Sequence, residues 1–190
     1  MSPRTADRAA AVERAVAELI QALGLDAAAE PELLKTPGRV ARLYAEVFGG
    51  LDPASEPDLE TFPHAAGGED LVLVRDIPFH SMCVHHLVPF FGRALVAYVP
   101  DQTIIGISGP ARLVDYYAHR PQLQERMGKA IADHLERLTK PRGVAVVLEA
   151  RHLCMEMRGI RKPGKVETRT VRGALAEPRW SGALRMSRRG

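Results

Sequence analysis

The spacing of the apolar residues changes near residue 70, and this change limits the folds open to the chain. Up to residue 50 the spacing is helical. It predicts one helix over 5–23 and a second that begins at Thr36-Pro37, because proline is favoured in the first turn of a helix. Further along, runs of β-branched and aromatic residues predict strands at 71–74, 87–99, 144–154 and 166–175, with helices between them at 109–119 and 121–138. Strands on both sides of a block of helices favour an α+β fold with an antiparallel sheet over repeated β-α-β units.

At 190 residues the chain has the length of one domain with extensions. We divide it into an N-terminal helical region over 1–50, a linker rich in proline, glycine and acids over 51–69, a main domain over 70–176 and a basic C-terminal tail over 177–190. No apolar run approaches the ~20 residues that a membrane-spanning helix needs, and the N-terminus has no signal-peptide core. We therefore expect a cytoplasmic protein with no membrane partner.

Charge is distributed unevenly along the chain. Residues 1–150 contain 15 Lys and Arg against 20 Asp and Glu, whereas residues 151–190 contain 11 against 3, so the balance changes from −5 to +8. Such asymmetry indicates either an anionic ligand or a solvated basic tail. Few aromatic residues besides Trp180 lie near the basic residues, and no nucleic-acid-binding module is recognisable, so we expect no nucleic-acid partner.

The cysteines and histidines suggest a metal site. Cys83 and Cys154 are the only cysteines, too few for a disulfide framework, and His86 follows Cys83 at a C-x-x-H spacing. Two thiolates and one imidazole suit zinc and leave a fourth position open, as in catalytic zinc sites. Alternatively, the cysteines are small buried apolar residues. On a strand His152 would share a face with Cys154, and His85 adjoins a ligand, so both histidines are candidates for proton transfer.

Six short motifs point to a known family. They are T-P-G-R-V-A-R (36–42), C-V-H-H-L-V-P-F-F-G (83–92), V-A-Y-V-P (96–100), I-G-I-S (105–108), R-P-Q-L-Q-E-R (120–126) and E-A-R-H-L-C-M-E-M-R-G (149–159). In this order and spacing, from about residue 12 to residue 176, the chain resembles the GTP cyclohydrolase I family. The resemblance implies the tunnelling fold, in which an antiparallel sheet carries two helices on one face and extra helices precede it. It also implies a homo-oligomeric ring, with pentamers that pair into a decamer and active sites at subunit interfaces.

The same resemblance implies a reaction. Water activated by Zn²⁺ would open the guanine imidazole ring of GTP at C8, formate would leave, and the ribose would rearrange to give 7,8-dihydroneopterin triphosphate for pterin and tetrahydrofolate biosynthesis. The motifs place the metal ligands at Cys83, His86 and Cys154. They also imply that His152 protonates the purine nitrogen and that His85 assists ring opening.

The motifs likewise imply the residues that bind substrate. Ser108 would contact the ribose, and Gln124 and Glu125 match the positions that hold the guanine edge, where a carboxylate can accept from two adjacent N–H groups. The cationic positions for the triphosphate fall on Arg39, Arg42, Arg112 and Arg158. Arginine suits this task because its charged hydrogen bonds to phosphate are strong and two-pronged.

Three departures from the family pattern fall near these residues. Val84 replaces the usual glutamate, and Gly109 replaces a lysine that would contact phosphate. After Arg158-Gly159 the stretch I-R-K-P-G-K-V-E-T-R-T replaces a Ser/Thr-rich one and is one residue short. Lys165 is a candidate replacement for the lost lysine charge, and Gly128 also stands where threonine is usual. The departures leave two alternatives open. One is a divergent cyclohydrolase of a specialised pathway, which acts on a related guanine nucleotide or stops at a ring-opened formamidopyrimidine. The other is a non-catalytic GTP-binding regulatory subunit.

Overall fold

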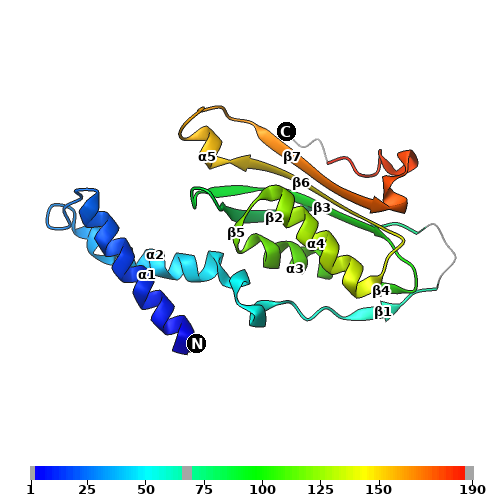
Figure 1. Ribbon diagram of the computed structural model, residues 1–190, viewed down its shortest axis with the longest axis horizontal. Helices are drawn as coiled ribbons and strands as arrows, with labels where there is room; N and C mark the ends of the chain where they lie inside the picture. The colour runs from blue at the N-terminus through cyan, green and yellow to red at the C-terminus, as the bar shows by residue number, and fades with distance from the viewer. Residues whose placement is uncertain (1–2, 66–69, 187–190) are drawn as a thin grey trace. The chain divides into compact units, whose positions relative to one another are not determined.

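The computed structural model describes residues 3–65 and 70–186, and the chain forms two compact units, Met1–Gly49 and Gly50–Gly190. The first unit contains α1 (Pro3–Ala22), η1 (Pro31–Lys35) and α2 (Thr36–Val47), and α1 packs against α2 (Figure 1). As predicted, α2 begins at Thr36-Pro37, because a proline in the first turn has no N–H that the helix would need. Among the described helices, none is long and apolar enough to cross a membrane.

The second unit is built on a five-stranded sheet with the order β5-β2-β3-β6-β7 (Figure 1). Its strands are β2 (Val72–Cys83), β3 (Pro89–Val99), β5 (Pro121–Gln122), β6 (Gly143–His152) and β7 (Lys165–Gly173). The α+β class is confirmed, and the four long strands are antiparallel. The short β5 is parallel to β2, so the sheet is mixed, and the prediction of a purely antiparallel sheet is wrong at this edge. Pro121 is tolerated there because an edge strand can lack one N–H.

Two helices cover one face of this sheet, as expected. They are α3 (Gly109–Ala118) and α4 (Gln124–Thr139), which pack on β2, β6 and β7 (Figure 1). The core-facing side of α4 is fully buried at Met127, Ile131 and Leu135. The helix begins at Gln124 rather than at Pro121, because residues 121–122 pair with β2 instead.

The opposite face of the sheet is covered by the C-terminal segment. This segment contains η4 (Ala174–Ala176) and η5 (Pro178–Trp180). Leu95 of β3 and Val147 of β6 belong to the same apolar cluster as Leu175 and Leu184. The expected basic tail is therefore held on the sheet as far as Met186, and its remaining residues, 187–190, lie outside the described residues.

The segment expected to be a linker is largely structured. It contains η2 (Gly49–Leu51), η3 (Pro53–Ser55) and β1 (Thr61–Pro63), and β1 pairs antiparallel with β4 (Thr103–Ile105). Leu59 belongs to the hydrophobic core between the sheet and the helices. Residues 66–69 lie outside the described residues.

Strand β2 continues well past the predicted 71–74. Its apolar pattern stops at Arg75 and Asp76, where Asp76 has a positive φ of 53° and the pairing with β3 shifts between Val74 and Ile77. A bulge of this kind absorbs an extra residue and lets the strand go on. The strand therefore reaches Cys83, which places a candidate metal ligand at its end.

Candidate metal centre and active site

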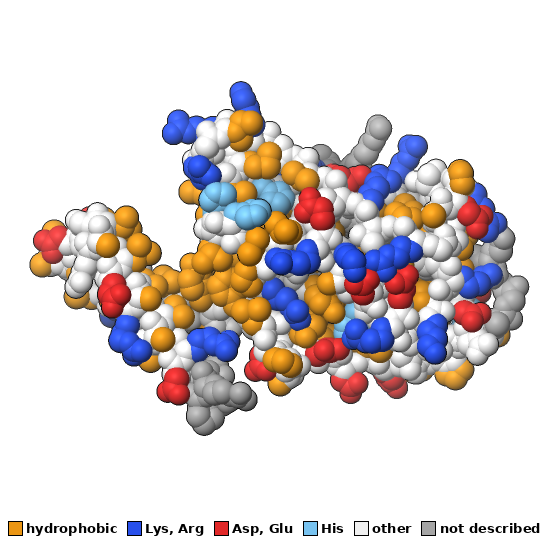
Figure 2. Space-filling view, viewed as in Figure 1, with side chains coloured by type: hydrophobic (Ala, Val, Ile, Leu, Met, Phe, Trp, Pro, Cys, Tyr) orange, Lys and Arg blue, Asp and Glu red, His pale blue; other side chains and the backbone are white. Residues whose placement is uncertain are grey.

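Cys83 and His86 are positioned by the tight connection between β2 and β3. The N–H of Cys83 donates to the carbonyl of Val88 (2.9 Å), and the carbonyl of Cys83 accepts from the N–H of Leu87 (2.8 Å). Leu87 closes this turn with a positive φ of 50°. The turn leaves His85 and His86 exposed, and Figure 2 shows histidine side chains grouped at one place on the surface.

Cys154 reaches the same place from β6. The strand ends at His152, and Cys154 lies in the short helix α5 (Leu153–Glu156). The prediction that one strand runs over 144–154 and points both side chains from one face is therefore wrong, because the chain turns into α5 after His152. The sulfurs of Cys83 and Cys154 and a ring nitrogen of His86 nevertheless lie within 4.8 Å of one another.

The surroundings of Cys154 affect the ionisation of its thiol. Burial raises the pKa of Cys154, and the neighbouring Cys83 raises it further. Two thiolates this close repel each other, and a bound cation reverses this effect by favouring both deprotonated forms. Two sulfurs and one imidazole are donors that zinc commonly takes in proteins. The chemistry of these three residues therefore fits a zinc ion.

A cavity of about 240 Å³ opens beside the two cysteines. His85 and His152 line it together with Gln124 and Glu125, and its apolar walls come from Leu123, Met155 and Val166. Strand β5 brings the start of α4 to this place, because the N–H of Val84 donates to the carbonyl of Gln122 at 3.0 Å. Residues from four separate segments of the sequence thus face one small space next to the thiol-imidazole cluster.

His152 is held on two sides. Its ring stacks on Phe90 with the ring centroids 4.7 Å apart and the planes at 2°, and its Nε2 lies 2.7 Å from Oε1 of Gln124. Burial lowers the pKa of His152, while the carboxylates of Glu125 and Glu156 raise it less strongly. The imidazole is therefore mainly neutral at pH 7.

Arg158 lies against the ligand cluster. Its guanidinium donates a hydrogen bond to Nε2 of His86 at 2.9 Å. Nδ1 of His85 lies 3.8 Å from Sγ of Cys83. Val84 is 37% exposed in the same turn and brings no charge to it. One of the four arginines expected to bind phosphate thus adjoins a candidate metal ligand.

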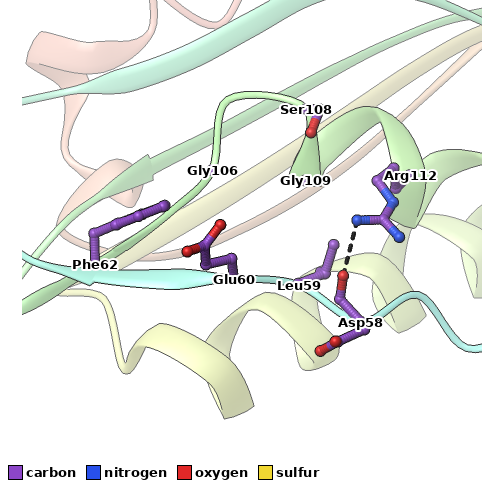
Figure 3. A pocket seen from close by; sticks show the side chains of 8 residues that line it. All are labelled: Asp58, Leu59, Glu60, Phe62, Gly106, Ser108, Gly109 and Arg112. Carbon is purple, nitrogen blue, oxygen red and sulfur yellow. Dashed lines mark hydrogen bonds between the residues drawn. The ribbon is translucent and has the colours of Figure 1, made fainter.

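Ser108 and Arg112 line a second cavity, of about 450 Å³, together with Gly109 (Figure 3). Ser108 is the N-cap of α3, but its side chain makes no capping hydrogen bond. Arg112 donates to the carbonyl of Asp58 at 2.8 Å, and Asp58 and Glu60 add two carboxylates to the lining. Among the residues that the structure describes, none lines both this cavity and the one beside the cysteines.

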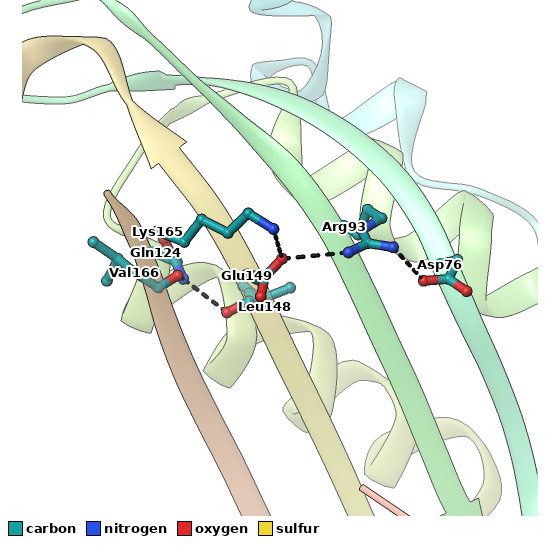
Figure 4. Close-up of polar contacts among 7 residues, drawn as sticks. All are labelled: Asp76, Arg93, Gln124, Leu148, Glu149, Lys165 and Val166. Carbon is teal, nitrogen blue, oxygen red and sulfur yellow. Dashed lines mark hydrogen bonds and ion pairs between the residues drawn. The ribbon is translucent and has the colours of Figure 1, made fainter. Parts of the chain in front are cut away.

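The remaining basic candidates lie elsewhere. Arg39 and Arg42 are exposed on α2 of the first unit. Lys165 is paired with Glu149 at 3.0 Å, in a row of charges across the sheet in which Arg93 bridges Glu149 and Asp76 (Figure 4). Within one chain, Lys165 does not line the cavity that contains Ser108.

Sequence reasoning missed the residues that support His152. Phe90 lies within a recognised motif, but nothing local shows that it pairs with His152 across β3 and β6. Val166 lines the cavity from β7, but no sequence motif identifies it as a site residue, because most of its neighbours in the cavity are far away in sequence. These contacts follow from strand register.

Together, the fold and the site define an α+β protein with a thiol-imidazole cluster that fits a metal ion, beside a histidine- and carboxylate-lined cavity, an arrangement typical of a metal-dependent hydrolase. The family model for GTP cyclohydrolase I matches residues 12–186. The chain is 52% identical to GTP cyclohydrolase 1 of Thermobifida fusca over 169 residues, which cover 87% of this chain and 81% of that protein. It is 53% identical to the same enzyme of Streptococcus mutans (85% of this chain, 84% of that protein) and 49% identical to that of Bacillus subtilis (87% of each). The chain belongs to the GTP cyclohydrolase I family.

Proposed function

We propose that this protein is a zinc-dependent GTP cyclohydrolase I, which hydrolyses GTP at C8 of the guanine ring, releases formate and forms 7,8-dihydroneopterin triphosphate. One observation carries the proposal. In a chain about half identical to GTP cyclohydrolase 1 proteins, Cys83, His86 and Cys154 converge beside a cavity lined by His152 and Glu125.

Cys83, His86 and Cys154 would hold zinc. Bound zinc would act as a Lewis acid and make water a nucleophile near neutral pH. His152, neutral and oriented by its neighbours, would accept a proton from the attacking water and pass it to the purine nitrogen. His85 is exposed beside Cys83, so its ring is free to move protons during ring opening. These roles need the substrate's imidazole ring to enter the cavity of about 240 Å³.

Glu125 would hold the guanine edge. It lies in the first turn of α4 and lines the cavity, and a carboxylate there can accept from two adjacent N–H groups of guanine. Adenine offers no such pair, so this contact would provide base specificity. The N-terminus of α4 also carries a partial positive charge that favours a carboxylate at this position.

The triphosphate would be bound by Arg158, Arg112, Arg39 and Arg42, with Ser108 at the ribose. In one chain, Arg158 adjoins the metal ligands, whereas Ser108 and Arg112 line a separate cavity. We therefore propose a homo-oligomer in which one subunit supplies the metal centre and a neighbour supplies Ser108 and Arg112. The family resemblance implies that this assembly is a tunnelling-fold ring of five that pairs into a decamer.

The reaction is tested by incubating purified, zinc-loaded protein with GTP. We expect formate release and, after oxidation, a fluorescent pterin. Cys154→Ser serves as the matched inactive control. Absence of formate release from GTP by protein with stoichiometric zinc would refute the proposal. A product heavier than GTP by about 18 mass units, the addition of one water, would instead show arrest at the ring-opened formamidopyrimidine.

The shared site is tested by complementation. Cys154→Ser and Arg112→Ala are each expected to be inactive as separate oligomers. If one subunit supplies the metal centre and another supplies Arg112, co-refolded mixtures contain some sites with neither substitution and regain part of the activity. If both groups act within one chain, the mixture stays inactive.

A further inference from the structure

The side chain of Gln124 is buried at the start of α4, with 2% of the residue exposed. Its Nε2 lies 2.9 Å from the carbonyl oxygen of Leu148 and 3.0 Å from that of Val166 (Figure 4). A third contact, of 3.2 Å, is with the hydroxyl of Thr168. The other end of the carboxamide, Oε1, lies 2.7 Å from Nε2 of His152.

These partners fix which way the carboxamide points. The carbonyl oxygens of Leu148 and Val166 can only accept hydrogen bonds, so they require the NH₂ group of Gln124 to face β6 and β7. A flipped carboxamide would place its oxygen against two carbonyl oxygens in a buried place and leave its N–H groups poorly paired. The hydroxyl of Thr168 can donate or accept, so it does not decide the orientation. Oε1 must therefore face His152.

An acceptor at Oε1 in turn fixes the proton of the imidazole. At 2.7 Å the contact is a hydrogen bond only if Nε2 of His152 carries the hydrogen. A neutral imidazole has a single N–H, so Nδ1 is then the bare nitrogen. Among the described residues, none forms a hydrogen bond with Nδ1 of His152, and the flat stack on Phe90 limits rotation of the ring.

We propose that Gln124 is a positioning residue: it holds His152 as the Nε2–H tautomer and leaves Nδ1 bare, as the nitrogen that accepts a proton from the attacking water and passes it to the substrate. This inference rests on the proposed function and gives Gln124 a different task from direct contact with guanine. Both N–H groups and the oxygen of its carboxamide are engaged within the chain, so the guanine edge is left to Glu125.

Kinetics separate the two roles of Gln124. Gln124→Met keeps the length of the side chain and removes its hydrogen bonds, so a positioning role predicts a fall in kcat of about tenfold or more with KM for GTP almost unchanged. Direct contact with guanine predicts a raised KM instead. Thr168→Val is the matched control, because it removes a neighbouring hydrogen bond to the same nitrogen and leaves the contact with His152 in place; we expect its kcat to stay within about twofold of the unmodified protein.

The tautomer is measured independently of turnover, by solid-state NMR of the full protein with ¹⁵N-labelled histidine, in which His152→Asn identifies the His152 signals. We expect a protonated Nε2 and a bare Nδ1 in the unmodified protein and a mixture of tautomers in Gln124→Met. A protonated Nδ1 in the unmodified protein, or an unchanged kcat in a folded Gln124→Met, would overturn the inference. If Gln124→Met does not fold, the spectrum of the unmodified protein decides. Failure of the proposed function would appear separately, as no formate from GTP whatever the tautomer.

Discussion

The imidazole of His152 lies flat against the ring of Phe90, with the ring centroids 4.7 Å apart and the planes at 2°. The two residues are direct partners in the antiparallel pairing of β3 and β6. Strand register thus sets the orientation of the proposed acid–base residue, while the start of α4 holds its Nε2 through Gln124. The sheet that forms the core of the unit is also the support of the site.

Phe90→Leu tests this support. Loss of the flat ring should let His152 rotate, so we expect kcat to fall by about tenfold and the free energy of unfolding to fall by about 1–3 kcal/mol. Phe91→Leu is the control, because Phe91 stacks on His80 instead, with ring centroids 5.6 Å apart. Steady-state kinetics and urea unfolding measure both effects. Equal losses of kcat in the two variants would contradict a specific role for Phe90.

Cys154→Ser tests the metal centre. A serine hydroxyl is a poor zinc ligand, so we expect zinc content to fall from nearly stoichiometric to substoichiometric, with loss of formate release and little change in circular dichroism. Metal analysis after dialysis measures zinc content. Met155→Leu is the matched control, because Met155 lines the same cavity without being one of the clustered ligands. Full zinc binding by Cys154→Ser would show that the ligand set is wrong.

Gly92→Ala tests the pairing of β3 with β6. A Cβ at residue 92 would collide with the carbonyl oxygen of Glu149, and this atom belongs to backbone that cannot move without breaking the sheet. We expect destabilisation of about 3 kcal/mol or more, or insoluble protein. Gly128→Ala is the comparison. Its Cβ would lie 3.2 Å from Oγ1 of Thr170, and the helix gains up to about 1 kcal/mol of propensity, so thermal unfolding should change little.

Gly109→Lys tests whether the triphosphate of GTP binds at the second cavity. A lysine there should attract the phosphates and lower KM for GTP by roughly two- to tenfold at low salt. The effect should be smaller at high salt, because dissolved ions screen the attraction between lysine and phosphate. The new Cβ would lie 2.7 Å from Cδ1 of Ile105, a flexible side-chain end that must shift. Gly109→Ala introduces the same Cβ without the charge. An identical KM in the two variants at low salt would place the phosphates elsewhere.

His134 makes stability depend on pH. It is 2% exposed, with Nδ1 at 3.0 Å from the hydroxyl of Tyr117, and burial lowers its pKa from 6.5, aided by Arg137 and Arg120 and opposed by Glu56. Above pH 6.5 the folded and unfolded states both hold a neutral ring. Below that pH the unfolded state takes up the proton first, so stability falls as the pH drops through 6.5 toward the lowered pKa of the folded state.

Denaturant unfolding at several pH values measures this effect. His134→Gln keeps a polar group near Tyr117 but cannot titrate, so we expect a smaller loss of stability in the variant than in the unmodified protein between about pH 7 and pH 5.5. The acidic residues contribute equally to the pH dependence of both proteins, so their contribution cancels in the comparison. If the free energy of unfolding falls equally with pH in the two proteins, His134 is not the source of the pH dependence.

Local sequence determined the elements whose signals are local. Thr36-Pro37 marks the start of α2 because proline is compatible with the first helical turn, and the apolar spacing of Met127, Ile131 and Leu135 defines the buried side of α4. The C-x-x-H spacing also indicated Cys83 and His86 as partners, since a single turn decides their separation.

Tertiary structure decided everything that depends on strand pairing. The bulge at Asp76 carries β2 on to Cys83, and the parallel pairing of β5 with β2 sets where α4 begins. Neither has a local signal, because both are stabilised by hydrogen bonds to residues far away in the sequence. Cys154 lies in a helix and not in a strand, yet its sulfur still lies within 4.8 Å of that of Cys83. The residue types of the site could be read from the sequence, whereas the orientation of each side chain is set by contacts between distant segments.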